Sequence, residues 1–150
     1  MGTIVEDVLE SAKWVAEALT GSGYKADFSP SSLWEIDRFF DENSKQGRPT
    51  PGGLLAEDLG ARIFAVGGYI GEVIRKAKGG KWVGNDTDPQ AEINIELQLP
   101  GGTTIWPVQR AVKRMKNGAE EGIAAYGHAF GLNVGARPGK PEKKPWWKPW

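Results

Sequence analysis

The residues best suited to chemistry centre on Glu72, a carboxylate inside an apolar helical segment that also carries Gly68 and Gly71. Burial of a carboxylate in such a segment raises its pKa unless a cation pairs with it. The predicted neighbours are three cations and two indoles from later in the chain: Arg110, Lys113, Arg114, Trp82 and Trp106. Two hypotheses follow. Glu72 is either an acid/base or ligand-anchoring group that works with Arg114 in a Trp-lined pocket, or a structural ion pair that fixes helix packing.

Other catalytic and metal-binding patterns are missing from the sequence. There is no cysteine, which excludes disulfides, thiolate zinc sites and a cysteine nucleophile. His128 is the only histidine and is accompanied by no Gly-x-Ser-x-Gly motif. The acidic segment 85–88 lacks the glycine and terminal glutamate of a calcium loop. We therefore expect no metal ion and no cofactor, and we favour a protein that is not an enzyme.

The C-terminal segment 136–150 differs in composition from the rest of the chain. Its prolines exclude a helix and favour an extended polyproline II conformation. Its three indoles are predicted to be exposed unless they bind something: Trp146, Trp147 and Trp150. Three hypotheses follow: the tail folds back onto this chain or a second copy, it docks on a protein partner, or its Trp and Lys side chains contact an anionic membrane surface.

The net charge of zero hides an asymmetry between the two parts of the chain. From Arg137 onward there are five cationic side chains and one carboxylate, Glu142, so the preceding part carries a surplus of four negative charges. An acidic body of this kind does not suit nucleic-acid binding. Opposite charges also predict that the tail and the body attract one another.

Hydrophobic periodicity places several helices around a small sheet. Thr3 and Glu6 predict a helix start, and apolar residues at helical spacing continue to Leu19. Further helices are predicted from Ser29-Pro30, over 54–78, from Pro107 and over 119–130, with strands at 81–83, 91–99 and 103–106, and a loop over 43–53. We therefore predict a single α+β domain over residues 1–135, with helices flanking an antiparallel meander and a glycine-containing central helix.

Four ordered motifs carry a resemblance to a bacterial family. They are Asp27-Phe28-Ser29-Pro30 with Ser32-Leu33 and Ile36-Asp37-Arg38-Phe39, then Gly68-Tyr69-Ile70-Gly71-Glu72, then Gly79-Gly80-Lys81-Trp82, and finally Pro107 with Val112-Lys113-Arg114 and Asn117-Gly118. Together they resemble an uncharacterised family of small bacterial domains of unknown function. The resemblance implies a helix–meander–helix fold and carries no catalytic residue to this chain.

The leading functional hypothesis is a non-enzymatic protein-binding module of immunity or adaptor type, whose acidic body binds a basic partner. The N-terminal segment has neither a basic flank nor an uninterrupted apolar run, so we expect the bacterial cytoplasm as the compartment. The alternatives are a small enzyme or ligand-binding domain around Glu72 and Arg114, and a peripheral membrane protein that binds through the tail.

Overall fold

The computed structural model describes residues 3–138, and within this range it confirms the predicted α+β fold. The helices are α1 (Ile4–Gly21), α2 (Leu33–Asn43), α3 (Leu59–Lys78), α4 (Ala91–Asn94), α5 (Pro107–Asn117) and α6 (Ile123–Ala129). Two 3₁₀ turns, η1 (Pro30–Ser32) and η2 (Gly118–Glu121), precede α2 and α6. The strands are β1 (Ser44–Lys45), β2 (Arg48–Pro49), β3 (Lys81–Val83), β4 (Glu96–Gln98) and β5 (Thr104–Ile105).

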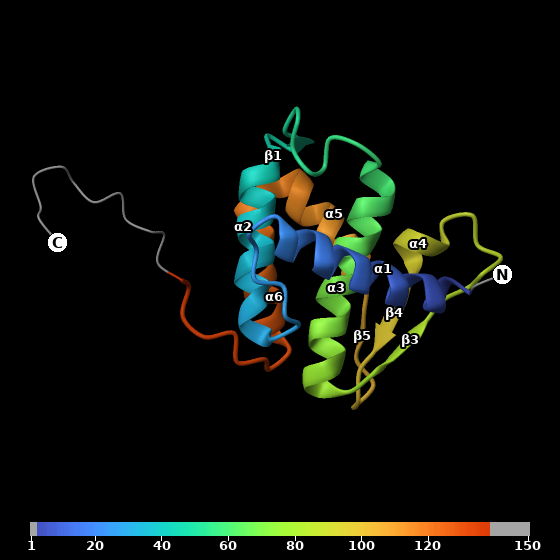
Figure 1. The fold of residues 1–150 in the computed structure, drawn as a ribbon. Helices are drawn as coiled ribbons and strands as arrows, with labels where there is room; N and C mark the ends of the chain where they lie inside the picture. Colours follow the sequence, from blue (N-terminus) through green and yellow to red (C-terminus); the bar gives the residue numbers. More distant parts are fainter. Residues whose placement is uncertain (1–2, 139–150) are drawn as a thin grey trace, which may run out of the picture.

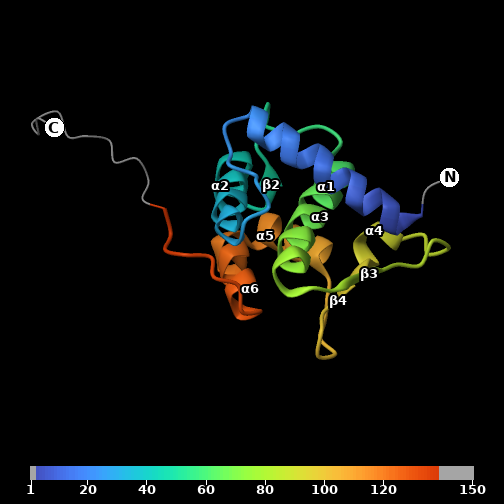
Figure 2. The same ribbon diagram turned by 60° about the horizontal axis from the view of Figure 1, so that its bottom comes forward.

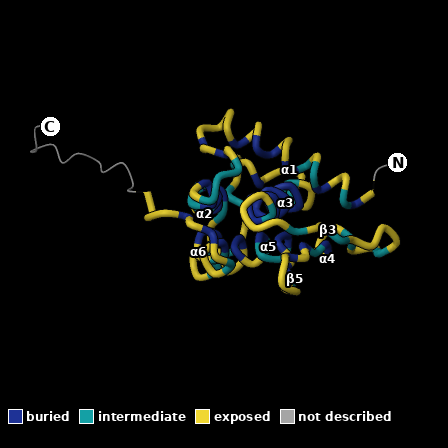
Figure 3. Tube along the Cα trace, turned by 90° about the horizontal axis from the view of Figure 1, so that it is seen from below, coloured by how far each residue is buried: buried dark blue, intermediate teal, exposed yellow. Residues whose placement is uncertain are grey.

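Helix α3 is the centre of the molecule, as predicted. It lies between α1 and α5 (Figure 3), and its central part, residues 63–74, is buried. A Cβ added to Gly67 would lie 2.5 Å from Val108 Cα of α5, and one added to Gly68 would lie 3.1 Å from the carbonyl oxygen of Val8 of α1. The glycines therefore let two neighbouring helices approach the α3 backbone, which explains why they are tolerated inside a helix.

The meander is an antiparallel sheet of order β3-β4-β5 at one end of the helical layer (Figure 1). Trp82 pairs with Leu97, and Leu97 pairs with Ile105, so the sheet turns apolar side chains toward α3 and α5. The loop after β3 returns to the start of α1, where Asp86 Oδ1 accepts a hydrogen bond of 2.7 Å from the Ile4 amide. The Thr3 hydroxyl accepts from the Glu6 amide, which confirms the predicted N-cap.

The prediction of a strand over 91–99 is wrong in its first half. Residues 91–94 form the short helix α4, and Ile93 is 37% exposed rather than buried. The side chain of Asp88 explains this turn, because it accepts hydrogen bonds from the Gln90 amide and the Asn94 side chain. Only β4 keeps the alternation, with Ile95, Leu97 and Leu99 buried.

Other boundaries also differ from the prediction. The central helix begins at Leu59 rather than at residue 54, because Asp58 adopts a left-handed backbone with φ of 49° and the Leu54 amide is bound by Asn43 Oδ1 at 2.8 Å. The predicted loop 43–53 contains the β1–β2 hairpin. The predicted helix 119–130 is divided into η2 and α6 by Gly122, whose ψ of 137° is extended.

Among the described residues, no helix combines the length and the apolar character needed to cross a membrane.

Candidate functional site

The Glu72 carboxylate is buried on α3 and bound by two neighbours. Arg75, one turn later, donates from Nη2 to Oε1 at 2.8 Å and from Nε to Oε2 at 2.5 Å. The Trp82 indole donates to Oε2 at 2.9 Å. Burial alone raises the pKa of Glu72, but the hydrogen bonds from Arg75 and Trp82 outweigh it and hold the pKa below its usual value. Both carboxylate oxygens therefore have donors, as in a structural ion pair.

Arg114 belongs to a different cluster. Its side chain is 3% exposed, and it donates from Nε to Asp37 Oδ1 at 2.9 Å and from Nη2 to Asp41 Oδ1 at 2.7 Å. Asp37 also accepts from the backbone amides of Ile123 and Ala124 at the start of α6. This cluster therefore joins α2, α5 and α6.

The predicted pairing of Glu72 with a cation of the helix that starts at Pro107, α5, is wrong. Gly71, next to Glu72, packs on Pro107 at the start of α5, whereas Arg114 lies seven residues further along that helix. At 1.5 Å per residue the two positions are about 10 Å apart along α5. Arg75, three residues from Glu72, supplies the cation instead. The structure does not bring Glu72 and Arg114 into one pocket.

Two further predicted residues lie apart from Glu72. Arg110 pairs with Glu121 and lies over the ring of Tyr126, 4.5 Å from its centroid. Burial raises the pKa of Tyr126 to about 12, against the opposing effect of Arg110. Trp106 precedes α5 and is 42% exposed. Trp146, Trp147 and Trp150 lie outside the described residues.

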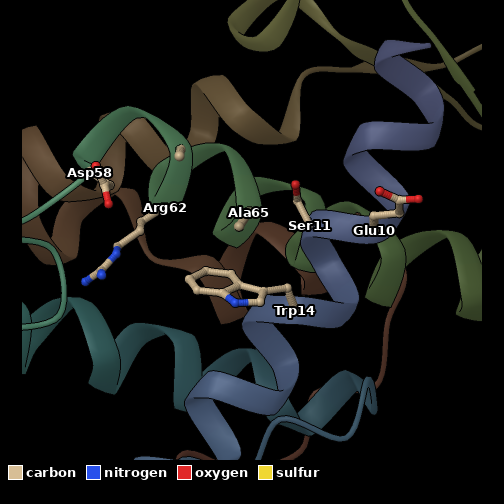
Figure 4. Close-up of a pocket in the computed structure, with 7 residues that line it drawn as sticks. Glu10, Ser11, Trp14, Asp58, Arg62 and Ala65 are labelled. Carbon is tan, nitrogen blue, oxygen red and sulfur yellow. The ribbon is translucent and has the colours of Figure 1, made fainter. Parts of the chain in front are cut away.

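A surface hollow of about 360 Å³ lies between α1 and α3 and contains none of the predicted site residues. Trp14 is its most prominent side chain and is 51% exposed. In Figure 4 the indole lies beside Ala65 and is directed along α3 toward Arg62. The complete lining is Glu10, Ser11, Trp14, Asp58, Ala61, Arg62 and Ala65, which we call the Trp14 hollow.

The small side chains of α3 create this hollow. Ala61 and Ala65 are one turn apart on α3, so they present a shallow floor under the indole. Arg62 is held at one end, because its Nη1 donates to the carbonyl oxygen of Leu54 at 2.5 Å. The side chain of Leu54 is itself 37% exposed.

Glu10 and Asp58 line the Trp14 hollow, and further carboxylates lie on the same two segments of the chain. The exposed side of α1 and the start of α3 carry six carboxylates and two cations: Glu6, Asp7, Glu10, Lys13, Glu17, Glu57, Asp58 and Arg62. We call these eight residues the acidic face. Their surplus of four negative charges equals the surplus of the whole chain ahead of Arg137, so the rest of that part is balanced. Within residues 3–138, none of these six carboxylates forms an ion pair.

Four aromatic rings of the described chain have a cation over them, and Trp14 is not one of the four. Arg38 lies over Tyr24, Lys76 over Phe28, Arg110 over Tyr126 and Arg114 over Phe40. In the described part of the chain, no cation lies over the Trp14 ring, although tryptophan is the aromatic side chain that attracts a cation most strongly. An exposed indole with carboxylates nearby has the chemistry to accept a positively charged side chain.

One sequence signal could have identified Trp14. The helix over residues 4–21 has a regular apolar stripe, and Trp14 falls outside it, one turn after Glu10 and one turn before Glu17. A large aromatic side chain on the charged side of an amphipathic helix is a candidate for a binding residue.

No group of three or more His, Asp or Glu side chains in residues 3–138 is placed to hold a metal ion. The Asp88 carboxylate accepts hydrogen bonds within its own turn, and Asp86 Oδ1 accepts from the Ile4 amide.

Comparison of the chain with protein-family models, with curated protein sequences and with solved structures gave no match. The resemblance to a bacterial family therefore remains a prediction, and the functional argument depends on the geometry of the chain itself.

Proposed function

We propose that this chain is a non-enzymatic protein-binding module of the immunity or adaptor type, which binds a cationic segment of its partner through the Trp14 hollow. The observation that carries the proposal is the half-exposed Trp14 ring within the acidic face. Tryptophan is enriched among residues that dominate binding energy at protein interfaces. The flanking carboxylates add electrostatic complementarity, which favours fast and selective association with basic partners.

Glu72 and Arg114, which were predicted from the sequence to lie in a binding pocket, have a structural role in this proposal. Glu72 is saturated by Arg75 and Trp82, and Arg114 is saturated by Asp37 and Asp41. Glu72 lies outside the Trp14 hollow. These groups maintain the helix packing that presents α1 and α3, while Trp14 and its neighbours face the partner.

Titration calorimetry with a defined peptide tests the proposal. The probe is a twelve-residue peptide that repeats Gly-Lys-Ser-Arg three times, and its control replaces Lys by Glu and Arg by Asp. The proposal predicts binding of the cationic peptide alone, with an affinity that falls as salt is raised. Equal binding of the acidic peptide, or no binding of either, would contradict it.

A matched pair of charge reversals locates the site. Glu10→Lys with Glu17→Lys reverses two carboxylates beside Trp14, whereas Glu92→Lys with Glu120→Lys changes the net charge equally on other exposed surfaces. We expect the first double variant to lose binding of the cationic peptide by about tenfold or more, since two attractive charges become repulsive. The second is expected to bind nearly as the unchanged chain does. A similar loss in both would show that net charge alone determines binding.

A further inference from the structure

We infer that the resident occupant of the Trp14 hollow is the chain's own C-terminal segment, residues 139–150, bound in cis, so that a protein partner must displace it. This inference rests on the proposed function, because both use the same surface. It adds a regulatory contact: the segment competes with the partner for Trp14.

Charge complementarity is the first argument. Beyond Pro138 the segment carries four lysines and one glutamate: Lys140, Lys143, Lys144, Lys148 and Glu142. The acidic face carries a surplus of four negative charges, and within the described residues none of its six carboxylates forms an ion pair. A lysine of the segment would supply the cation that the Trp14 ring lacks, and its tryptophans would add apolar contact along Ala61, Ala65 and Leu54.

The point at which the segment leaves the body is the second argument. The Trp34 indole on α2 donates to the carbonyl oxygens of Val134 and Gly135 at 3.1 and 3.3 Å, which fixes the chain shortly before Pro138. One turn further along α2, Arg38 Nη2 donates to the carbonyl oxygen of Gly23 at 2.9 Å and so holds the chain just after α1. Adjacent turns of one helix therefore hold the start of the segment and the end of α1.

The length of the segment suffices for the remaining distance. Trp14 lies seven residues before Gly21, which is about 10 Å along α1. In a polyproline II conformation, nine residues from Gly139 reach about 28 Å and twelve reach about 37 Å. The radius of gyration of a domain of this size is about 14 Å. In Figure 2, α1 runs from above α2, on the side where the chain leaves α6, to the opposite side of the body. Both lengths are at least about twice that radius, so Trp147 and Trp150 lie far enough along the segment to span a large part of the body.

Covalent attachment strengthens such a contact. A short tether gives an effective concentration in the millimolar range, so even a weak interaction is largely formed. The same tether makes the contact reversible by a partner that binds more tightly.

A spin label tests the contact directly, and the absence of cysteine makes single labelling simple. A nitroxide on Glu142→Cys of the full chain is expected to broaden the NMR signals of the Trp14 indole N–H and of the Ala61 and Ala65 amides. A label on Thr103→Cys, exposed in the β4–β5 turn, is the control and should leave these signals sharp. Glu10→Lys with Glu17→Lys should abolish the broadening, and Glu92→Lys with Glu120→Lys should preserve it.

Competition provides the second measurement. A full-length variant has its tail lysines and tryptophans replaced by Ser, at Lys140, Lys143, Lys144, Trp146, Trp147, Lys148 and Trp150. We expect it to bind the cationic peptide about tenfold more tightly than the unchanged chain, because the tethered competitor is gone.

The outcomes separate this inference from the proposed function. Peptide binding with no broadening at Trp14 and no gain in the Ser-substituted chain overturns the inference and leaves the function standing. Loss of peptide binding in every variant overturns the function itself. Broadening that appears only when spin-labelled chains are mixed with separate isotope-labelled chains assigns the contact to a second copy. That result overturns docking in cis. Association of the segment with anionic vesicles that leaves the Trp14 signals unchanged also overturns it.

Discussion

Asp37 and the buried guanidinium of Arg114 form an ion pair that also begins a helix. Arg114 Nε donates to Asp37 Oδ1 at 2.9 Å, while the two oxygens of the same carboxylate accept from the Ile123 and Ala124 amides at 2.8 and 2.9 Å. One side chain of α2 thus satisfies the guanidinium of α5 and the first amides of α6. The carboxylate also lies at the positive end of the α6 dipole.

Removal of this carboxylate is predicted to destabilise the fold strongly. Asp37→Ala leaves a buried guanidinium and two backbone amides without their main acceptor, and such a loss costs about 3–5 kcal/mol. Asp41→Ala is the matched control, because its side chain is 48% exposed and Arg114 keeps Asp37. We expect the control to cost no more than about 1 kcal/mol in the free energy of unfolding, measured in urea. Equal losses in the two variants would contradict this account.

Glu72 is predicted to make stability depend on acid pH. Burial raises the pKa of Glu72, but the hydrogen bonds from Arg75 and Trp82 lower it by more. The folded-state pKa therefore lies below the unfolded value of about 4.3. The ionised group therefore stabilises the fold above that pH, and the contribution is lost as pH falls through the folded pKa. Glu72→Gln should lower the free energy of unfolding by about 1–3 kcal/mol at pH 7.

The difference between the Glu72→Gln variant and the unchanged chain should shrink as the pH falls toward 3, measured by urea unfolding at each pH. The exposed Glu92→Gln substitution is the control and should change stability by less than about 0.5 kcal/mol at pH 7. A difference at Glu72 that stays constant across this range would mean that its charge does not contribute.

Two glycines of α3 should respond in opposite directions to the same substitution. Gly60→Ala adds a methyl group that meets nothing within 4 Å, so it should stabilise the helix by about 0.4–1 kcal/mol. Gly67→Ala places the methyl group 2.5 Å from Val108 Cα and should destabilise by about 1–3 kcal/mol despite its better helix propensity. Thermal unfolding of both variants measures the signs. A gain at Gly67 would mean that α5 can move away from α3 without cost.

The sequence predicted the elements that have local signals. The cap at Thr3, the apolar stripe that continues to Leu19 and the proline at the start of α5 each depend on neighbouring residues, and all are found in the structure. The packing of α3 against other backbones was also predictable, because glycine inside an apolar helix favours close approach.

The errors occur where distant side chains determine the backbone. Asn43 binds the Leu54 amide from eleven residues away and so helps to delay the start of α3. Asp37 binds Arg114 across 77 positions, which no spacing rule indicates. The pairing of Glu72 with Arg75 was within reach of sequence reasoning, since residues three apart share a helix face.

Trp14 depends both on a local sequence signal and on packing between distant parts of the chain. Its place on the charged side of α1 is visible in the sequence. Its exposure beside a hollow depends on α3, which presents Ala61 and Ala65 there rather than larger side chains. That juxtaposition is set by the crossing of two helices separated by a long stretch of chain.

The most direct test of the central claim compares two exposed tryptophans. The affinity of the Gly-Lys-Ser-Arg repeat peptide is measured by calorimetry for the unchanged chain, for Trp14→Ala and for Trp106→Ala. Trp106 is 42% exposed and lies outside the Trp14 hollow and the acidic face, so its loss controls for the general effect of removing an indole. We predict that Trp14→Ala weakens binding by about tenfold, or about 1.4 kcal/mol, and that Trp106→Ala leaves it nearly unchanged. Equal affinities for the two variants would contradict the proposal that Trp14 is the centre of the binding site.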